Sequence, residues 1–173
     1  MRDADEGIAR RAPLARYLLQ GGRPVRDAAG KAFGIALPEV GCRAHAGGER
    51  AALWLGPEEH LLLAPPAEAK ALESQLAAAL QGLAHSLVDV SQRQVALTVR
   101  GPRARDLLES GCPLDLDAER FAVNACARTL FAKAEVVLWR RGAEEYYLEV
   151  PRSFLGYVLG WLREAAQPGV HHA

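Results

Sequence analysis

Two stretches of this chain follow one pattern, and that repetition constrains the fold more than any other feature. Residues 52–66 read ALWLGPEEHLLLAPP, and residues 137–151 read VLWRRGAEEYYLEVP. Each is an apolar run that ends in Trp, a polar turn and a second apolar run that ends near Pro, which predicts a β-hairpin. We therefore expect the chain to build the same hairpin twice, by duplication. At one fixed offset the identical pairs are Leu53 with Leu138, Trp54 with Trp139, Glu59 with Glu144, Leu63 with Leu148 and Pro66 with Pro151.

Each expected hairpin is followed by a helical pattern. Leu72, Leu76 and Leu80 recur at four-residue spacing, and Pro66 and Gly82 flank them, so we predict a helix over residues 68–81. After the second hairpin, residues 152–165 predict another helix. Its expected apolar side consists of Phe154, Tyr157, Val158, Trp161 and Leu162.

The remaining segments give a mixed pattern. Before the first hairpin we expect a short helix over 13–22, a loop to Gly30 and a strand over 31–41. Between the hairpins, apolar alternation and a Pro-to-Gly segment predict two strands and a short helix, at 85–91, 94–101 and 102–111. The last three strands are expected at 126–132, 135–141 and 145–151.

These elements indicate an α+β, two-layer fold of two fused split-βαβ-like modules, with antiparallel-rich sheets and helices on one side. Residues 1–30 are expected to form a partly disordered N-terminal arm, and residues 167–173 a loose tail. The first module is placed at residues 31–92 and the second at residues 93–166.

Composition excludes several classes of protein. Lys plus Arg and Asp plus Glu both number 21, so the net charge is zero and a nucleic-acid binder is disfavoured. The three cysteines are far apart, which is typical neither of a disulfide framework nor of a zinc site. The start, MRDADEGIARRAP, lacks the apolar segment of a secretory signal, and no apolar run reaches about 18 residues, so we expect a cytoplasmic protein that does not enter a membrane.

The sequence offers little chemistry, and we predict no catalytic, cofactor-binding or metal-binding residue. Nucleotide-binding, metalloprotease and hydrolase motifs do not occur in it. Cys112 and Cys126 are expected to be buried small hydrophobes rather than activated thiolates. The isolated histidines and the acids around the 102–111 helix are expected to be surface or turn residues; they are His45, His60, His85, His171, His172, Asp106, Glu109, Asp115 and Asp117.

Aromatic residues gather in the last 35 or so positions. In an alternating strand, Tyr146 and Tyr147 point to opposite faces, so we expect one of them to be exposed, as interface aromatics are. Gly156 and Gly160 form a GxxxG pattern in the last helix. We expect it to permit close packing of that helix on its own sheet or on the backbone of a partner.

Six short segments, in order, carry a resemblance to a known family: WLGPEE, VDVSQR, RGPRARDLL, GCPLDL, CARTL and PRSF. Each is weak alone, but the ordered set, over about Pro13 to Ala165, resembles the gamma subunit family of heterotetrameric sarcosine oxidase. That family is similar in fold to aminomethyltransferase, the glycine-cleavage T-protein. The folate enzymes carry paired acids where this chain has Lys133 and Glu135, which argues against independent folate binding.

The resemblance implies a small non-catalytic assembly subunit of a flavin-dependent complex that oxidatively demethylates sarcosine. Its implied partners are the alpha, beta and delta subunits. This chain is expected to hold no cofactor, with FAD, FMN, NAD and tetrahydrofolate on the larger subunits and zinc on the smallest. In this interpretation the duplicated hairpin is scaffold, and its sheet edges and uncovered faces dock the larger subunits.

If the chain is such a subunit, its polar partner contacts are expected from the family-like segments. The candidates, beside Tyr146 and Tyr147, are Ser91, Arg93, Arg128, Arg152 and Ser153. Arginine suits this role because its planar fork binds carboxylates and carbonyls while its stem packs on apolar surface. The alternative for each arginine is a solvated side chain or an internal bridge to Asp89 or Glu149.

Two other functions stay open at this point. A stand-alone folate-binding or aminomethyltransferase-like protein would need a carboxylate for the pterin, and Glu135, Asp115 and Asp89 are the available acids. Asp89 is better explained as an acceptor of backbone N–H bonds from the following turn. The third possibility is a self-associating scaffold unrelated to oxidases.

Overall fold

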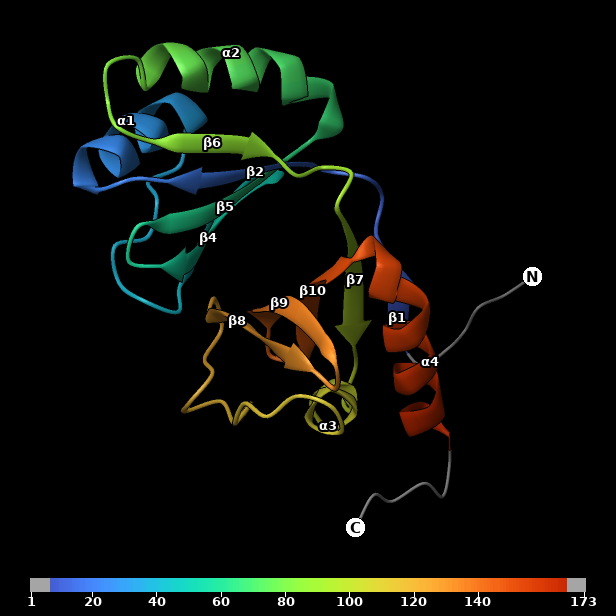
Figure 1. Cartoon of the computed structure of the whole chain (residues 1–173). Helices are drawn as coiled ribbons and strands as arrows, with labels where there is room; N and C mark the ends of the chain where they lie inside the picture. The colour runs from blue at the N-terminus through green and yellow to red at the C-terminus, as the bar shows by residue number, and fades with distance from the viewer. Residues whose placement is uncertain (1–6, 168–173) are drawn as a thin grey trace. The chain divides into compact units, whose positions relative to one another are not determined.

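The computed structural model describes residues 7–167, which form two compact units. The N-terminal unit is Pro13–Ser91, and the C-terminal unit combines residues 7–12 with residues 92–167. Each unit is built on a five-stranded antiparallel sheet that carries two α-helices (Figure 1). Within the described residues, no helix is both long enough and apolar enough to cross a bilayer.

In the N-terminal unit the strand order is β3-β4-β5-β2-β6, and helices α1 and α2 cover one face. Tyr17 of the sheet donates a hydrogen bond from its hydroxyl to the Ala69 carbonyl at 2.7 Å, which ties α2 to β2. The elements are β2 (Ala15–Gln20), α1 (Arg23–Phe33), β3 (Ala44–Gly47), β4 (Arg50–Gly56), β5 (Glu59–Ala64), the 3-10 turn η1 (Pro66–Glu68), α2 (Ala69–Ala79) and β6 (Ser86–Asp89).

In the C-terminal unit the order is β1-β7-β10-β9-β8, so the first strand of the described residues forms one edge of the later sheet. Ile8 of β1 pairs with Val99 of β7 and joins the core under α3 and α4. The elements are β1 (Ile8–Arg10), β7 (Gln94–Arg100), α3 (Ala104–Glu109), β8 (Cys126–Phe131), β9 (Ala134–Gly142), β10 (Glu145–Pro151), the 3-10 turn η2 (Arg152–Phe154) and α4 (Leu155–Ala166).

The hairpins β4–β5 and β9–β10 repeat one another, down to an irregularity before each turn. In the first, the pairing shifts between Trp54 and Gly56; in the second, it shifts at the pair that closes the turn, Gly142 with Glu145. One strand of each hairpin thus carries an extra residue, the signature of a β-bulge, which bends the strand.

The register of this repeat differs from the sequence match by one residue. The pair Gly56–Glu59 corresponds to Gly142–Glu145, an offset of 86, whereas the five sequence identities along the hairpin gave an offset of 85. Trp54 therefore corresponds to Arg140 and not to Trp139. Because side chains alternate across a strand, a slip of one residue exchanges the two faces, and the sequence match had paired residues of opposite faces.

Residues 7–30 form strands and a helix rather than the partly disordered arm that we predicted, and residues 1–6 lie outside the described residues. Within the described part, residues 15–20 form a strand rather than a helix, and α1 occupies a segment expected to be loop and strand. Val25, Ala29 and Phe33 recur at four-residue spacing along α1 and are all buried. The helix ends at Gly34, whose φ of 79° is the left-handed conformation that glycine adopts at no steric cost. The expected tail at 167–173 lies, except for Gln167, outside the described residues.

The helices do lie on one side of each sheet, but the opposite faces are not open surfaces. In β10, Tyr146 and Leu148 belong to the core under the helices, while Tyr147 and Glu149 alternate with them. Tyr147 is nevertheless only 2% exposed, and Leu61 of β5 is equally buried. Side chains at these positions are not exposed to a partner, and docking through the sheet edges stays a prediction.

Candidate interaction site

Both tyrosine candidates are buried, which corrects the prediction that one of them faces outward. Tyr146 is 1% exposed and lies under the Arg140 guanidinium, which is 5.4 Å from the ring centroid. Burial raises the pKa of Tyr146. Tyr147 donates its hydroxyl hydrogen bond to Glu149 and meets Trp139 edge-on, with ring centroids 5.7 Å apart. The prediction failed because it assumed that one face of the sheet is exposed.

Ser91 serves the fold of the N-terminal unit. Its backbone N–H donates to Asp89 Oδ1 at 2.8 Å, and its Oγ accepts from the Arg16 backbone N–H at 2.9 Å. These bonds tie the end of β6 to the start of β2. Asp89 has the turn-bracing role that the sequence favoured over pterin binding.

Arg128 lies on the edge strand β8, away from the other candidates in its sheet. Its Nε is 3.9 Å from Glu135 Oε1 on the neighbouring strand, and both side chains are at least a third exposed. An exposed pair at this distance contributes about 0–1 kcal/mol. Asp115, another acid considered for folate binding, accepts a hydrogen bond from the Asp117 backbone N–H at 3.0 Å.

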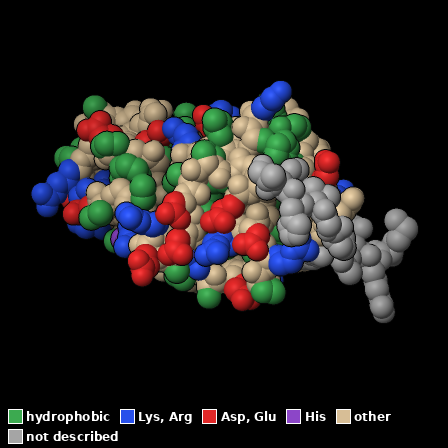
Figure 2. Space-filling model, turned by 90° about the horizontal axis from the view of Figure 1, so that it is seen from below, with side chains coloured by type: hydrophobic (Ala, Val, Ile, Leu, Met, Phe, Trp, Pro, Cys, Tyr) green, Lys and Arg blue, Asp and Glu red, His purple; other side chains and the backbone are tan. Residues whose placement is uncertain are grey.

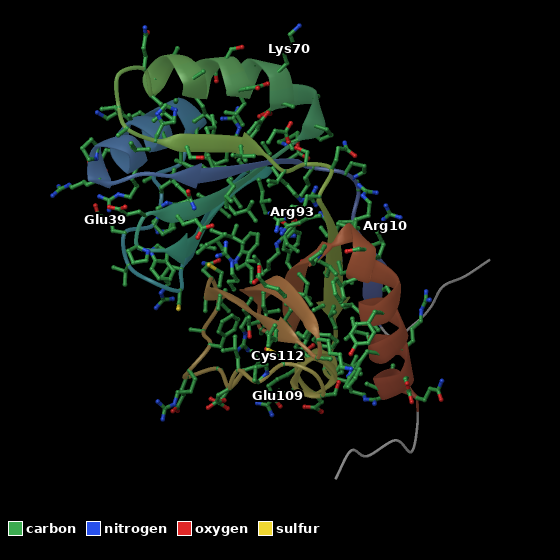
Figure 3. The ribbon with its side chains drawn as sticks, viewed as in Figure 1. Arg10, Glu39, Lys70, Arg93, Glu109 and Cys112 are labelled. Atoms are coloured by element: carbon green, nitrogen blue, oxygen red, sulfur yellow. The ribbon has the colours of Figure 1, made fainter. Side chains whose placement is uncertain are left out.

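Arg93, Arg152 and Ser153 are brought together where β7 begins and β10 ends. The Arg152 backbone N–H donates to the Arg93 carbonyl at 2.9 Å, and Arg152 Nε donates to the Gln92 carbonyl at 2.9 Å. All three candidate side chains are exposed (Figure 3 labels Arg93). Together with Arg128, they are the members of the predicted set that are exposed at the surface.

The outer surface of α4 continues from this point, and it differs from the prediction. Phe154 and Tyr157 were expected on the buried side, but they are 40% and 38% exposed. The buried side consists of Val158, Leu162, Ala165 and Ala166. Phe154 and Tyr157 meet edge-on, with ring centroids 6.3 Å apart.

Gly156 and Gly160 lie on the same outer surface of α4. A Cβ built on either glycine would have no atom within 4 Å apart from the helix's own neighbouring backbone. Of the two explanations for this GxxxG pattern, close packing on the protein's own sheet is therefore wrong. The repeat could have indicated the buried side of α4, because at an offset of 86 the buried Leu72 and Leu76 of α2 correspond to Val158 and Leu162.

His60 and Cys112 are titratable groups whose pKa is shifted by burial, and neither is arranged for catalysis. His60 Nε2 lies 2.8 Å from the Pro38 carbonyl, and burial lowers the pKa of His60. Burial also raises the pKa of the Cys112 thiol, which keeps it protonated. No group of three or more His, Cys, Asp or Glu side chains in residues 7–167 is arranged to hold a metal ion. His171 and His172 lie outside these residues.

An open pocket of about 620 Å³ lies beside α1 in the N-terminal unit. Its charged groups largely satisfy one another, because Arg26 donates to Asp27 at 3.1 Å and also to Glu39. His45 Nδ1 lies 2.7 Å from the Ala36 carbonyl in the same wall. This arrangement shows no group poised for acid–base work.

Comparison with known proteins identifies the family. The family model described as "Sarcosine oxidase, gamma subunit family" matches residues 23–168. The chain belongs to the sarcosine oxidase gamma subunit family. Among curated relatives, the sarcosine oxidase subunit gamma of Arthrobacter sp. is 39% identical over 136 residues, which cover 78% of this chain and 66% of the relative. The matched segment thus spans just under two thirds of that protein.

Solved structures agree with this membership. A chain of heterotetrameric sarcosine oxidase from Corynebacterium sp. U-96 is similar with a TM-score of 0.86 and 29% identity, covering 96% of this chain and 87% of that chain. The glycine cleavage system aminomethyltransferase T from Bartonella henselae has a TM-score of 0.69 at 14% identity, covering 90% of this chain and 45% of that chain. The second likeness concerns the fold alone, and it is the aminomethyltransferase-like fold that the sequence implied.

Proposed function

We propose that this chain is a small non-catalytic assembly subunit of a heterotetrameric, flavin-dependent sarcosine oxidase. The observation that carries the proposal is the family match over residues 23–168, together with a TM-score of 0.86 to a chain of the heterotetrameric enzyme. The proposed partners are the alpha, beta and delta subunits. FAD, FMN, NAD, tetrahydrofolate and zinc are assigned to those partners.

The local chemistry supports a scaffold role. Asp89 and Asp115 accept backbone N–H bonds, and Glu135 lies beside Arg128, so the carboxylates that a pterin site would need have structural partners. The buried His60 is hydrogen-bonded to a carbonyl. Cysteine at position 112 has its pKa moved away from the thiolate range needed for nucleophilic catalysis.

The topology supports a finer description of the scaffold. In the N-terminal unit, β2 lies between the hairpin strand β5 and the edge strand β6. In the C-terminal unit, β7 lies in the same way between the hairpin strand β10 and the edge strand β1. This order favours a split-βαβ plan for each unit, in which β1 has the edge position in the C-terminal sheet that β6 has in the N-terminal sheet. Such a plan gives each unit one sheet with its helices on one face.

Co-purification from the native host tests the proposed function. A tagged full-length copy replaces the native gene, and the affinity-purified material is examined by gel and by absorbance spectrum. We expect a yellow preparation with two larger polypeptides and one very small one, oxidising sarcosine. A colourless preparation of the tagged chain alone, from cells grown on sarcosine, would contradict the proposal. Titration of that lone chain with tetrahydrofolate would then test the folate-binding alternative.

A further inference from the structure

The two units share one architecture, so their equivalent helices can be compared, and their differences indicate a docking surface. Helices α2 and α4 follow equivalent hairpins and start 86 residues apart, at Ala69 and Leu155. Both bury one side against their own sheets, through Leu72 and Leu76 in α2 and through Val158 and Leu162 in α4. Differences between their outer surfaces therefore cannot come from the packing of the core.

The outer surface of α2 is that of an ordinary solvated helix. It carries Lys70, Glu73, Ser74 and Gln75, all exposed. At the corresponding positions α4 has Gly156, Leu159, Gly160 and Trp161, and no charged side chain occurs between residues 153 and 162. We call Phe154, Gly156, Tyr157 and Gly160 the outer face of α4.

The outer face of α4 combines exposed rings with exposed backbone. Phe154 and Tyr157 present aromatic surface, and Tyr157 also meets Trp161 at 6.2 Å between centroids. The two glycines are one turn apart and leave the helix backbone exposed beside the rings. Exposed aromatic side chains are enriched in interfaces, and glycines allow a second helix to approach closely.

The border of this face carries unpaired positive charge. Arg10 pairs with the core residue Leu97 across β1 and β7, so it lies on the α4 side of the sheet, and Figure 3 places it beside the first turns of α4. Arg93 and Arg152 lie at the same end of α4. Within residues 7–167, these three arginines have no carboxylate partner.

We propose that the outer face of α4 binds a helix of a partner subunit, one with small side chains at its centre and carboxylates at one end. The bare glycines and the Tyr157 ring receive the small side chains, and Arg10, Arg93 and Arg152 bind the carboxylates. This inference rests on the proposed function, because it names the surface through which the subunit assembles.

Bulk added at the glycines tests the proposal without disturbing the fold. Gly160→Leu meets no atom within 4 Å of the new Cβ in the free chain, and leucine favours a helix more than glycine does. We expect the isolated variant to melt at or above the wild-type temperature. In the native host, it should recover at least about tenfold less of the partner polypeptides and flavin, as expected when bulk enters a packed interface.

The matched control is Ser74→Leu, the same bulk at the corresponding exposed position of α2. It should recover the partners as well as wild type does. Full recovery by a folded Gly160→Leu, or an equal loss with Ser74→Leu, would overturn the docking proposal while the proposed function stands. Failure of wild type itself to recover any partner would instead overturn the proposed function, and the docking surface with it.

A second variant tests the charged border independently. Arg10→Glu reverses one charge beside α4, and Lys70→Glu makes the same reversal on the exposed side of α2. We expect Arg10→Glu to lower partner recovery severalfold and to remove part of its dependence on salt, because opposite charges at an interface rim attract. Lys70→Glu should have no effect. Equal behaviour of the two variants would contradict carboxylates at that end of the partner helix.

Discussion

His60 shows how one buried residue makes the stability of this fold depend on pH. The side chain is 2% exposed, and its neutral ring donates from Nε2 to the Pro38 carbonyl. Burial is the main reason that its pKa lies below the ordinary 6.5; the Pro38 carbonyl opposes that shift, and Arg26 adds to it. The unfolded chain therefore binds a proton here more readily than the folded chain does. This contribution to stability is present above pH 6.5 and is lost as the pH falls below that value.

Replacing His60 with Gln should remove that loss. The amide can still donate to the Pro38 carbonyl, but it does not titrate. The wild-type free energy of unfolding should fall by up to about 1.4 kcal/mol per pH unit from this group below pH 6.5. Urea denaturation at a series of pH values should show a shallower decline for His60→Gln. His85→Gln, which removes an exposed imidazole, is the control; identical slopes for wild type and His60→Gln would contradict the argument.

At the scale of an element, β1 depends on one glycine for its place at the edge of its sheet. Gly7 has a φ of 79°, and a Cβ there would lie 2.0 Å from the Arg100 carbonyl oxygen. The Gly7 carbonyl accepts the Arg100 backbone N–H at 3.0 Å. Any side chain at position 7 must therefore push β1 away from β7.

We expect Gly7→Ala to weaken the pairing of β1 with β7. Hydrogen exchange should become faster at the Arg100 amide, and the free energy of unfolding should fall. Gly48→Ala is the control, because Gly48 also has positive φ, at 60°, but has no atom within 4 Å of a new Cβ. The control carries only the backbone cost of about 1 kcal/mol, and Gly7→Ala should cost at least twice that. Equal losses would mean that close contact with β7 does not matter.

The elements also show which features the sequence could predict. The strands and helices after residue 50 were predicted because their apolar periodicity and flanking Gly and Pro agree. The elements before residue 50 were not predicted correctly. Residues 15–20 are few, and Tyr17, Leu18 and Leu19 form a continuous apolar run, so their periodicity could not separate strand from helix. The pairing of β1 with β7 joins residues about 90 positions apart, and no local pattern records it.

The site was predicted less well than the fold, for a related reason. Exposure of Tyr147 or of α4 depends on which faces are covered, and that is a property of the tertiary structure. The buried Arg140 makes the same point, because its guanidinium donates to the Phe121 and Ala143 carbonyls at 2.9 Å and so organises an irregular segment. Nothing in the sequence distinguishes it from the neighbouring Arg141, whose side chain is 35% exposed.

At the scale of the whole molecule, net charge and exposed apolar surface together influence how readily copies of the chain associate. The chain has 21 basic and 21 acidic residues and a pI of about 7.0, and the two kinds are interspersed on the face shown in Figure 2. A protein without net charge has little electrostatic repulsion to keep its copies apart. A subunit that is always bound to partners does not need that repulsion, but the isolated chain does.

The isolated chain should therefore be least soluble near pH 7, and the outer face of α4 should contribute to its association. Tyr157→Glu and Ser74→Glu each add one negative charge at an exposed helix position, so both should raise solubility at pH 7 and move its minimum to lower pH. Only Tyr157→Glu also removes exposed aromatic surface. Light scattering at pH 7 should show a larger fall in self-association for Tyr157→Glu than for Ser74→Glu, whereas equal effects would mean that net charge alone governs association and that the outer face of α4 plays no part in it.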